Sequence, residues 1–165
     1  MPAHTKIDHP TLGEIVLVAS DAGLSQVTFT GQRHDRPLED GSRADPAAPV
    51  LRDAVAQLES YLAGELREFD LPLAPSGTPF QQSVWTELVS IPFGQTTSYG
   101  AIATSLPMPS AARAVGSAVG RNPIAVIVPC HRVLGSAGAL TGYAGGLHRK
   151  KHLLELEGIL QPTLG

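Results

Sequence analysis

The sequence has very little cysteine and no long hydrophobic run. Its single cysteine, Cys130, excludes an internal disulfide and any metal site built from several cysteines. No apolar stretch approaches the length of a membrane span, and the N-terminus lacks the basic and then apolar segments of a secretory signal. Internal repeats and low-complexity segments are also missing. We therefore expect a cytoplasmic protein without disulfides.

Charge is unevenly distributed along the 165 residues, which provide enough chain for one or two small domains. Residues 1–77 contain six Lys or Arg and twelve Asp or Glu, whereas residues 78–165 contain six and three. A basic half joined to an acidic half is typical of a polyanion-binding module beside a module that does not bind the polyanion. The contents of hydrophobic residues (42%) and charged residues (16%) are typical of a globular protein.

The acidic half alternates strand-like and helix-like patterns. Gly23, between two strand-like runs, is free to take a positive φ in a hairpin. The polar stretch 31–49 is expected to be a surface loop. The patterns predict strands over 13–19, 24–30 and 69–73 and a helix over 50–62. A Pro-Ser-Gly linker ends at residue 77, where the charge changes sign, and we place the domain boundary there.

The basic half begins with a predicted capping box. Thr78 is a good N-cap, and Gln81 three residues later completes the box of a helix that buries Trp85 in the core. Further helices are expected over 98–106, 111–120 and 147–157. The first two of these form a helix-turn-helix, in which the second helix commonly faces DNA. Its side chains are nearly all small, except Arg113, although small residues also allow close packing inside proteins.

The only cysteine lies in the stretch 122–133, which reads Asn-Pro-Ile-Ala-Val-Ile-Val-Pro-Cys-His-Arg-Val. Residues 124–128 predict a buried strand, which Pro129 ends because it has no N–H. Cys130 is then flanked by a base and a cation, His131 and Arg132, which favour a thiolate. Adjacent residues of an extended chain point to opposite faces, so a water or a bend must connect His131 to the sulfur. An inert buried cysteine is the alternative, and these residues alone leave both readings open.

The end of the last helix carries an unusual carboxylate. Glu157 falls on the apolar side of the helix, one turn after Leu153 and Leu154, where an anion needs a partner. We expect that partner to be His131. Whether the cations Arg121, Lys150 and Lys151 contact phosphate is left open.

Pro129 to Val133, together with Asn122 and Pro123, resembles the active-site signature of the O6-alkylguanine-DNA alkyltransferases, the methylated-DNA–protein-cysteine methyltransferases. The resemblance is strongest over residues 78–158. It implies a mixed α/β (α+β) fold in two domains. Residues 1–77 would form a ribonuclease-H-like sheet with a flanking helix, and residues 78–165 a winged-helix-like helix-turn-helix domain for DNA binding and alkyl transfer.

The resemblance also implies site residues. Cys130 is the acceptor, and His131, Glu157 and a water form a relay that generates the thiolate. Asn122 ties the active-site turn to the helix-turn-helix, and Tyr99 helps to rotate the target nucleotide. Guanine-edge contacts are implied for Val133, Tyr143 and Ala144. Contacts with DNA are implied for Arg113, which enters the duplex in place of the flipped base, and for Ser110, Ala111, Ala112, Gly116 and Ser117, in a minor groove too narrow for bulky side chains.

The implied function is direct-reversal DNA repair in a single turnover. The alkyl group of O6-alkylguanine in double-stranded DNA passes irreversibly to Cys130 after base flipping, with O4-alkylthymine left open as a second substrate. We expect a monomer that uses no cofactor. We also expect no structural metal, because the cysteine and histidine zinc ligands of some members are missing here. Ala144 departs from a serine found in some members, which puts one base contact in doubt.

Three other functions are weighed against this one. A damage-binding protein that does not repair would lack the acceptor cysteine, but Cys130 is present. A cysteine hydrolase would need a distant histidine brought beside the thiol, whereas His131 is the immediate neighbour. A transcriptional regulator would need longer polar side chains on its recognition helix to read base edges.

Overall fold

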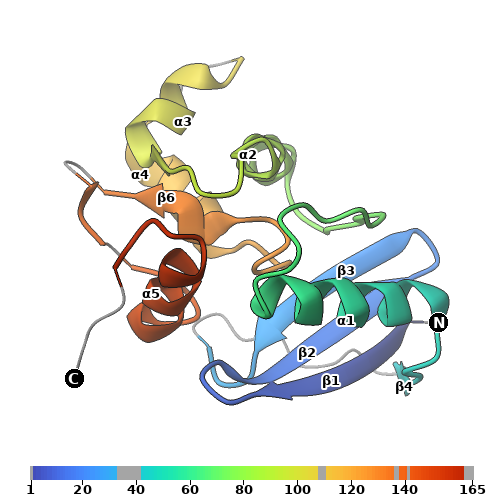
Figure 1. Ribbon diagram of the computed structural model, residues 1–165. Helices are drawn as coiled ribbons and strands as arrows, with labels where there is room; N and C mark the ends of the chain where they lie inside the picture. The colour runs from blue at the N-terminus through green and yellow to red at the C-terminus, as the bar shows by residue number, and fades with distance from the viewer. Residues whose placement is uncertain (1, 33–41, 108–110, 136–137, 141, 162–165) are drawn as a thin grey trace. The chain divides into compact units, whose positions relative to one another are not determined.

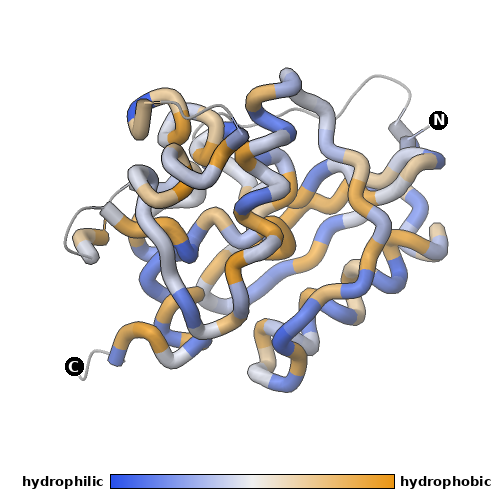
Figure 2. Tube along the Cα trace, turned by 90° about the horizontal axis from the view of Figure 1, so that it is seen from above, coloured by the Kyte–Doolittle hydropathy of each residue, from blue (hydrophilic) through white to orange (hydrophobic). Residues whose placement is uncertain are grey.

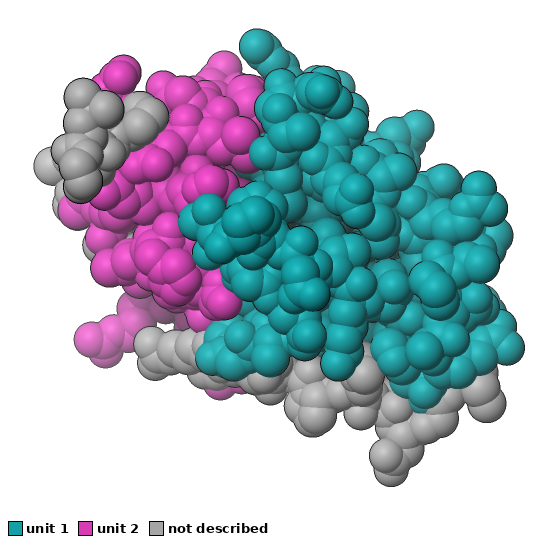
Figure 3. All heavy atoms as spheres, turned by 60° about the horizontal axis from the view of Figure 1, so that its bottom comes forward, with its two compact units in different colours: residues 1–76, 123–127 teal, residues 77–122, 128–165 magenta. Residues whose placement is uncertain are grey.

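A computed structural model describes residues 2–32, 42–107, 111–135, 138–140 and 142–161. The chain divides into two units, which Figure 3 shows in different colours. Unit 1 contains residues 1–76 and 123–127, and unit 2 contains residues 77–122 and 128–165. The chain therefore returns to unit 1 for five residues shortly before Cys130.

A four-stranded sheet forms the centre of unit 1, in the order β3-β2-β1-β4. Its strands are β1 (Ala3–His9), β2 (Gly13–Ser20), β3 (Gly23–Phe29) and β4 (Arg43–Ala44). The antiparallel pairs β1–β2 and β2–β3 include Ile7 opposite Ile15 and Ile15 opposite Phe29. The predicted hairpin of β2 and β3 is confirmed, with Gly23 at φ 144°. Strand β1 was not predicted, because five of its seven residues are polar. Its pairing with β2 supplies the order that its own sequence pattern does not indicate.

Helix α1 (Pro49–Leu62) lies across one face of this sheet (Figure 1) and confirms the helix predicted over 50–62. It buries Leu51, Ala54, Leu58 and Tyr61 at helical spacing. Each fully buried leucine contributes about 1.5–3 kcal/mol relative to an exposed one. The apolar face of α1 therefore supplies much of the unit 1 core.

The strand predicted over 69–73 is wrong. Only Leu73 pairs, in an isolated bridge with Leu24, through the bonds from Leu24 N to Pro72 O and from Ala74 N to Leu24 O, both 2.8 Å. Pro72 cannot donate a bond and so limits the ladder. A Cβ on Gly23 would lie 2.6 Å from Pro72 O, so this approach also requires glycine.

The strand predicted over 124–128 is also wrong, although all five residues are buried. Ile124 makes one isolated bridge with Val27 of β3. Val126 then turns the chain at φ 70°, with a 2.8 Å bond from Ile127 N to Ala125 O, as in the rare γ-turn with a positive φ. This backbone conformation of a β-branched residue costs on the order of 1–3 kcal/mol. Burial alone, without a ladder, explains the apolar run.

Unit 2 is mainly helical. Its elements are α2 (Pro79–Val89), β5 (Thr97–Ser98), α3 (Tyr99–Ser105), α4 (Ala112–Gly120), the 3₁₀ turn η1 (Cys130–Arg132), β6 (Val133–Leu134) and α5 (Leu147–Leu156). The capping box of Thr78 and Gln81 is confirmed. Trp85 is 2% exposed and donates from Nε1 to Ala118 O at 2.9 Å, which confirms its predicted place in the core. The mixed α+β fold expected from the sequence is confirmed.

No helix in the described part of the chain is long and apolar enough to cross a membrane. Figure 2 shows why, since hydrophobic stretches along the chain are short and interrupted by hydrophilic residues.

Candidate active site

Cys130 occupies the first position of η1 and is only 7% exposed. Pro129 precedes it at φ −81° and ψ 65°, and Cys130 N donates to Val128 O at 2.8 Å, which closes an inverse γ-turn. Residues of a 3₁₀ turn follow one another at about 120° around its axis rather than on opposite faces. The bend that the sequence required between Cys130 and His131 is therefore present as this turn.

Asn122 holds the turn from the other side. Its Nδ2 donates to Val128 O at 2.8 Å, and its backbone N–H donates to Val119 O of α4 at 3.2 Å. The side chain therefore connects the residues before Cys130 to the C-terminal end of α4. This is the connection between the active-site turn and the helix-turn-helix that the family resemblance implied for Asn122.

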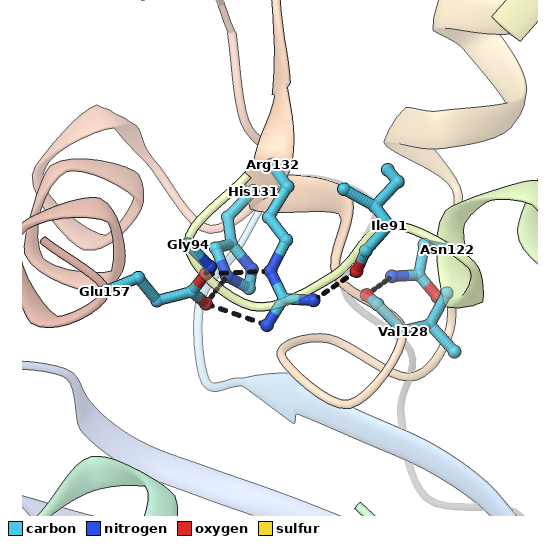
Figure 4. A network of polar contacts seen from close by, with 7 residues as sticks. All are labelled: Ile91, Gly94, Asn122, Val128, His131, Arg132 and Glu157. Atoms are coloured by element: carbon cyan, nitrogen blue, oxygen red, sulfur yellow. Dashed lines mark hydrogen bonds and ion pairs between the residues drawn. The ribbon is translucent and has the colours of Figure 1, made fainter. Parts of the chain in front are cut away.

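The Glu157 carboxylate is the centre of a buried polar network (Figure 4). His131 Nε2 bonds to Oε2 at 2.7 Å, which confirms the predicted pairing of these two residues. Arg132 donates from Nε to Oε1 at 2.8 Å and from Nη2 to Oε2 at 3.0 Å, and Gly94 N donates to Oε1 at 3.0 Å. Each carboxylate oxygen therefore accepts two N–H bonds.

Arg132 also connects this network to the segment after α2. Its Nη1 donates to Ile91 O at 2.6 Å, and its guanidinium carbon lies 5.8 Å from the ring centre of Phe93. The bidentate pairing with Glu157 has the geometry of a strong charge-assisted interaction. The sequence analysis treated Arg132 only as a cation beside the cysteine, and its role in fixing the carboxylate was missed.

The bond to Glu157 sets the tautomer of His131. Because the ionised carboxylate can only accept, Nε2 carries the hydrogen and Nδ1 carries the lone pair of a neutral imidazole. Burial lowers the pKa of His131, the Glu157 contacts raise it, and the charges of Arg132 and Lys150 lower it further, so that the net shift is downward. His131 is therefore neutral at rest, with a nitrogen able to take up a proton.

The thiol is subject to opposing influences. Burial raises the pKa of Cys130 above its ordinary value, and this effect prevails. The Asn122 side chain, the Lys150 charge and the Tyr143 side chain, in that order, lower the pKa of Cys130. The site thus keeps a protonated thiol in the free protein and holds several groups that stabilise the thiolate.

Of the residues implied for base contacts, Val133 is fully buried and Tyr143 and Ala144 are half-buried. The hydroxyl of Tyr143 is buried. Val133 O accepts from Lys150 Nζ at 2.7 Å. The sequence left open whether Lys150 contacts phosphate; in the structure the residue is 0% exposed and its ammonium group is bonded inward to Val133 O. Lys150 is a second functional candidate that the sequence analysis missed.

The residues implied for DNA contacts gather on α4 rather than around the thiol. Ala111, Ala112, Arg113 and Ser117 are exposed, while Ser110 lies outside the described residues. Helix α4 begins one residue later than predicted, with Ala111 as its N-cap. Helix α3 packs against α4 as expected of a helix-turn-helix, and a Cβ on Gly116 would lie 3.7 Å from the Tyr99 ring.

Family comparisons cover nearly the whole chain. The family model for the ribonuclease-like domain of 6-O-methylguanine DNA methyltransferase matches residues 4–75, and the model for its DNA binding domain matches residues 79–159. A methylated-DNA–protein-cysteine methyltransferase of Methanosarcina acetivorans is 50% identical over 147 residues, which are 89% of this chain and 93% of the relative. A protein of the same name from Mycobacterium bovis is 50% identical over 151 residues, 92% of this chain and 89% of the relative.

Solved structures agree with these relatives. Mycobacterium tuberculosis OGT in complex with DNA matches at a TM-score of 0.85 and 48% identity, over 94% of this chain and 92% of that chain. The O6-methylguanine methyltransferase of the same organism matches at a TM-score of 0.86 and 48% identity, over 98% and 96%.

Proposed function

This chain belongs to the 6-O-methylguanine DNA methyltransferase family and is a methylated-DNA–protein-cysteine methyltransferase, and we propose that it removes the alkyl group of O6-alkylguanine in duplex DNA by transfer to Cys130. The observation that carries the proposal is the arrangement of Cys130 at the start of a buried turn, followed by His131 bonded at 2.7 Å to Glu157. Direct-reversal repair of DNA follows from family membership.

The chemistry balances without a second nucleophile. The thiol proton passes through a water to Nδ1 of His131 and onward, and the thiolate attacks the alkyl carbon in line with the C–O bond. The C–S bond forms as the C–O bond to guanine breaks. The guanine takes up one proton from the Tyr99 hydroxyl, and the proton that the thiol released reaches Tyr99 through water and restores that hydroxyl, so no net proton is gained or lost. The thioether has no group to hydrolyse it, so each protein molecule acts once.

The DNA surface in this proposal is the exposed face of α4. Its small side chains suit the minor groove, which is about 6 Å wide, and Arg113 is the long side chain that takes the place of the flipped base. The Val133 carbonyl and the loop at Tyr143 and Ala144 contact the guanine edge. O4-alkylthymine carries the same alkyl ether and is included as a second substrate. The protein acts as a monomer in the cytoplasm, where reducing conditions keep its acceptor a thiol.

The experiment is intact-mass measurement after mixing the protein with a duplex that contains O6-methylguanine. We expect a gain of one methyl group, mapped to the peptide that holds Cys130 and absent in Cys130→Ser. Tight lesion binding without a mass change would support the alternative, a protein that binds alkylation damage without repair. A gain that persists in Cys130→Ser would refute the assignment of the acceptor.

A further inference from the structure

Lys150 is an exceptional lysine because its side chain is 0% exposed, and it ranks among the largest fully buried side chains of the chain. Lysine is almost never fully buried unless its charge is compensated. It lies in the first half of α5, seven residues before Glu157, and therefore on the same face of the helix two turns away. Its neighbour Lys151 has a 44% exposed side chain and pairs with Glu155.

The ammonium group of Lys150 is tied to the turn that holds the cysteine. Nζ donates to Val133 O at 2.7 Å, and Val133 N donates in turn to Cys130 O, which closes η1. Helix α5 packs against η1. A fixed cation is therefore bonded to the residue that completes the Cys130 turn.

The charge of Lys150 and the charge of the Cys130 thiolate stabilise each other, as the directions of their pKa shifts indicate. The Cys130 thiolate raises the pKa of Lys150 against the larger lowering by burial, and Lys150 lowers the pKa of Cys130. Lys150 also lowers the pKa of His131. The titratable groups that act on Cys130 are Lys150 of α5 and Tyr143 of the loop before it. The network of His131, Arg132 and Glu157 is bonded within itself, and Lys150 acts on its His131.

We propose that Lys150 is the fixed counter-cation of the Cys130 thiolate, and that His131 conducts the thiol proton away without keeping it. An ammonium in this place favours the thiolate but disfavours a second cation on the imidazole. Arg132 opposes the imidazolium as well. The reactive state is then thiolate with ammonium, beside a neutral His131. Lys150 does not touch the alkyl group, so it is a positioning residue that acts through the sulfur and through the Val133 carbonyl.

The first test follows the rate of Cys130 alkylation by iodoacetamide against pH, which reports the Cys130 thiolate because the chain has one cysteine. We expect Lys150→Met to move the Cys130 titration upward by roughly 1–3 pH units, the usual effect of an opposite charge at close range. Lys151→Met removes the same charge one residue along, on the exposed side, and should leave the titration in place. Equal titrations of Cys130 in the two variants would overturn the proposal.

A second measurement remains decisive if Lys150→Met does not fold. The chain contains three lysines, Lys6, Lys150 and Lys151, so carbon-13-labelled lysine gives three assignable NMR signals. Coupling between two sites is reciprocal, so the pKa of Lys150 should fall in Cys130→Ser, because the thiolate that raises it is gone. A Lys150 titration that is the same with and without the thiol would refute the proposal.

The proposal deepens the proposed function, since it identifies what compensates the thiolate charge, but neither test uses DNA. Methyl transfer together with a Cys130 titration unaffected by Lys150→Met would overturn the role of Lys150 and leave the repair function standing. A Cys130 titration shifted by Lys150→Met, in a protein that does not take up a methyl group, would support the role of Lys150 and overturn the repair function.

Discussion

Replacing Glu157 by glutamine should destabilise unit 2 severely. Glutamine has nearly the same shape, but it offers one acceptor oxygen and one NH₂ donor where the carboxylate offers two acceptors. Each oxygen of Glu157 now accepts two N–H bonds, from Arg132, His131 and Gly94. Either orientation of the amide therefore points its NH₂ group at two donors.

The magnitude follows from these bonds. Hydrogen bonds to a charged group contribute about 1.5–3 kcal/mol each, so the loss of two gives about 3–6 kcal/mol. Breaking a buried ion pair from one side costs about 3–5 kcal/mol, which agrees. The side chain of Glu157 is 0% exposed and that of Arg132 is 7% exposed, so water cannot take over the lost bonds. A loss of about 3–5 kcal/mol lowers the unfolding midpoint by roughly 6–20 °C in a protein of this size.

The assay is urea unfolding followed by the fluorescence of Trp85, the only tryptophan, which is buried in the same unit. Glu155→Gln is the matched control, because Glu155 pairs only loosely with Lys151 at 3.9 Å on the surface, and we expect a change of about 0.5 kcal/mol or less. Adding Arg132→Met to Glu157→Gln should cost at least about 1 kcal/mol less than Arg132→Met alone. Additive effects of the two substitutions would refute the network as a single energetic unit.

Two further predictions concern charge. Burial lowers the pKa of His131, so acid protonates this residue in the unfolded chain before it does so in the folded protein. The free energy of unfolding should therefore fall as the pH drops below about 6.5, by up to about 1.4 kcal/mol per pH unit. Urea midpoints measured across this range should show a slope that His131→Gln reduces, and identical slopes in the two proteins would contradict the assignment. Arg113→Ala should reduce the preference for a duplex with O6-methylguanine over an undamaged duplex. Arg121→Ala removes another exposed cation at the end of α4, so it should weaken binding to both duplexes equally and reduce the salt dependence of that binding. Binding titrations at two salt concentrations separate these outcomes, and an equal loss of preference in the two variants would contradict the role of Arg113.

The elements with strong local signals could be predicted from the sequence. The capping box at Thr78 and the leucines of α1 act through neighbouring residues, so their consequences are visible in a short window. The pairing of Glu157 with His131 was predictable for a different reason. A carboxylate on the apolar face of a helix needs a partner wherever the chain supplies one.

The segment 124–128 shows where this reasoning fails. A run of β-branched residues indicates burial, but burial and a strand ladder are separate properties. The positive φ of Val126 depends on bonds to Val27, nearly a hundred residues earlier, which no local pattern reveals.

The burial of Lys150 did have a signal in the sequence. It lies four residues before Leu154 and seven before Glu157, on the stripe that α5 buries. The sequence analysis considered Lys150 and Lys151 only as possible phosphate contacts, although Lys150 lies on the apolar side of the helix. The bidentate bonds of Arg132 had no such signal, because they depend on where the end of α5 lies in space.

The five residues 123–127 make the two units interleaved along the chain. A cut between Ser76 and Gly77 would leave an N-terminal fragment whose Val27 has lost both of its backbone partners, Pro123 and Ala125. The other fragment would carry a short apolar segment, next to the acceptor cysteine, with nothing to cover it. Each fragment holds what the other lacks. Separating the halves at this point would therefore uncover the edge of β3 and release the segment that leads into the active-site turn at the same time.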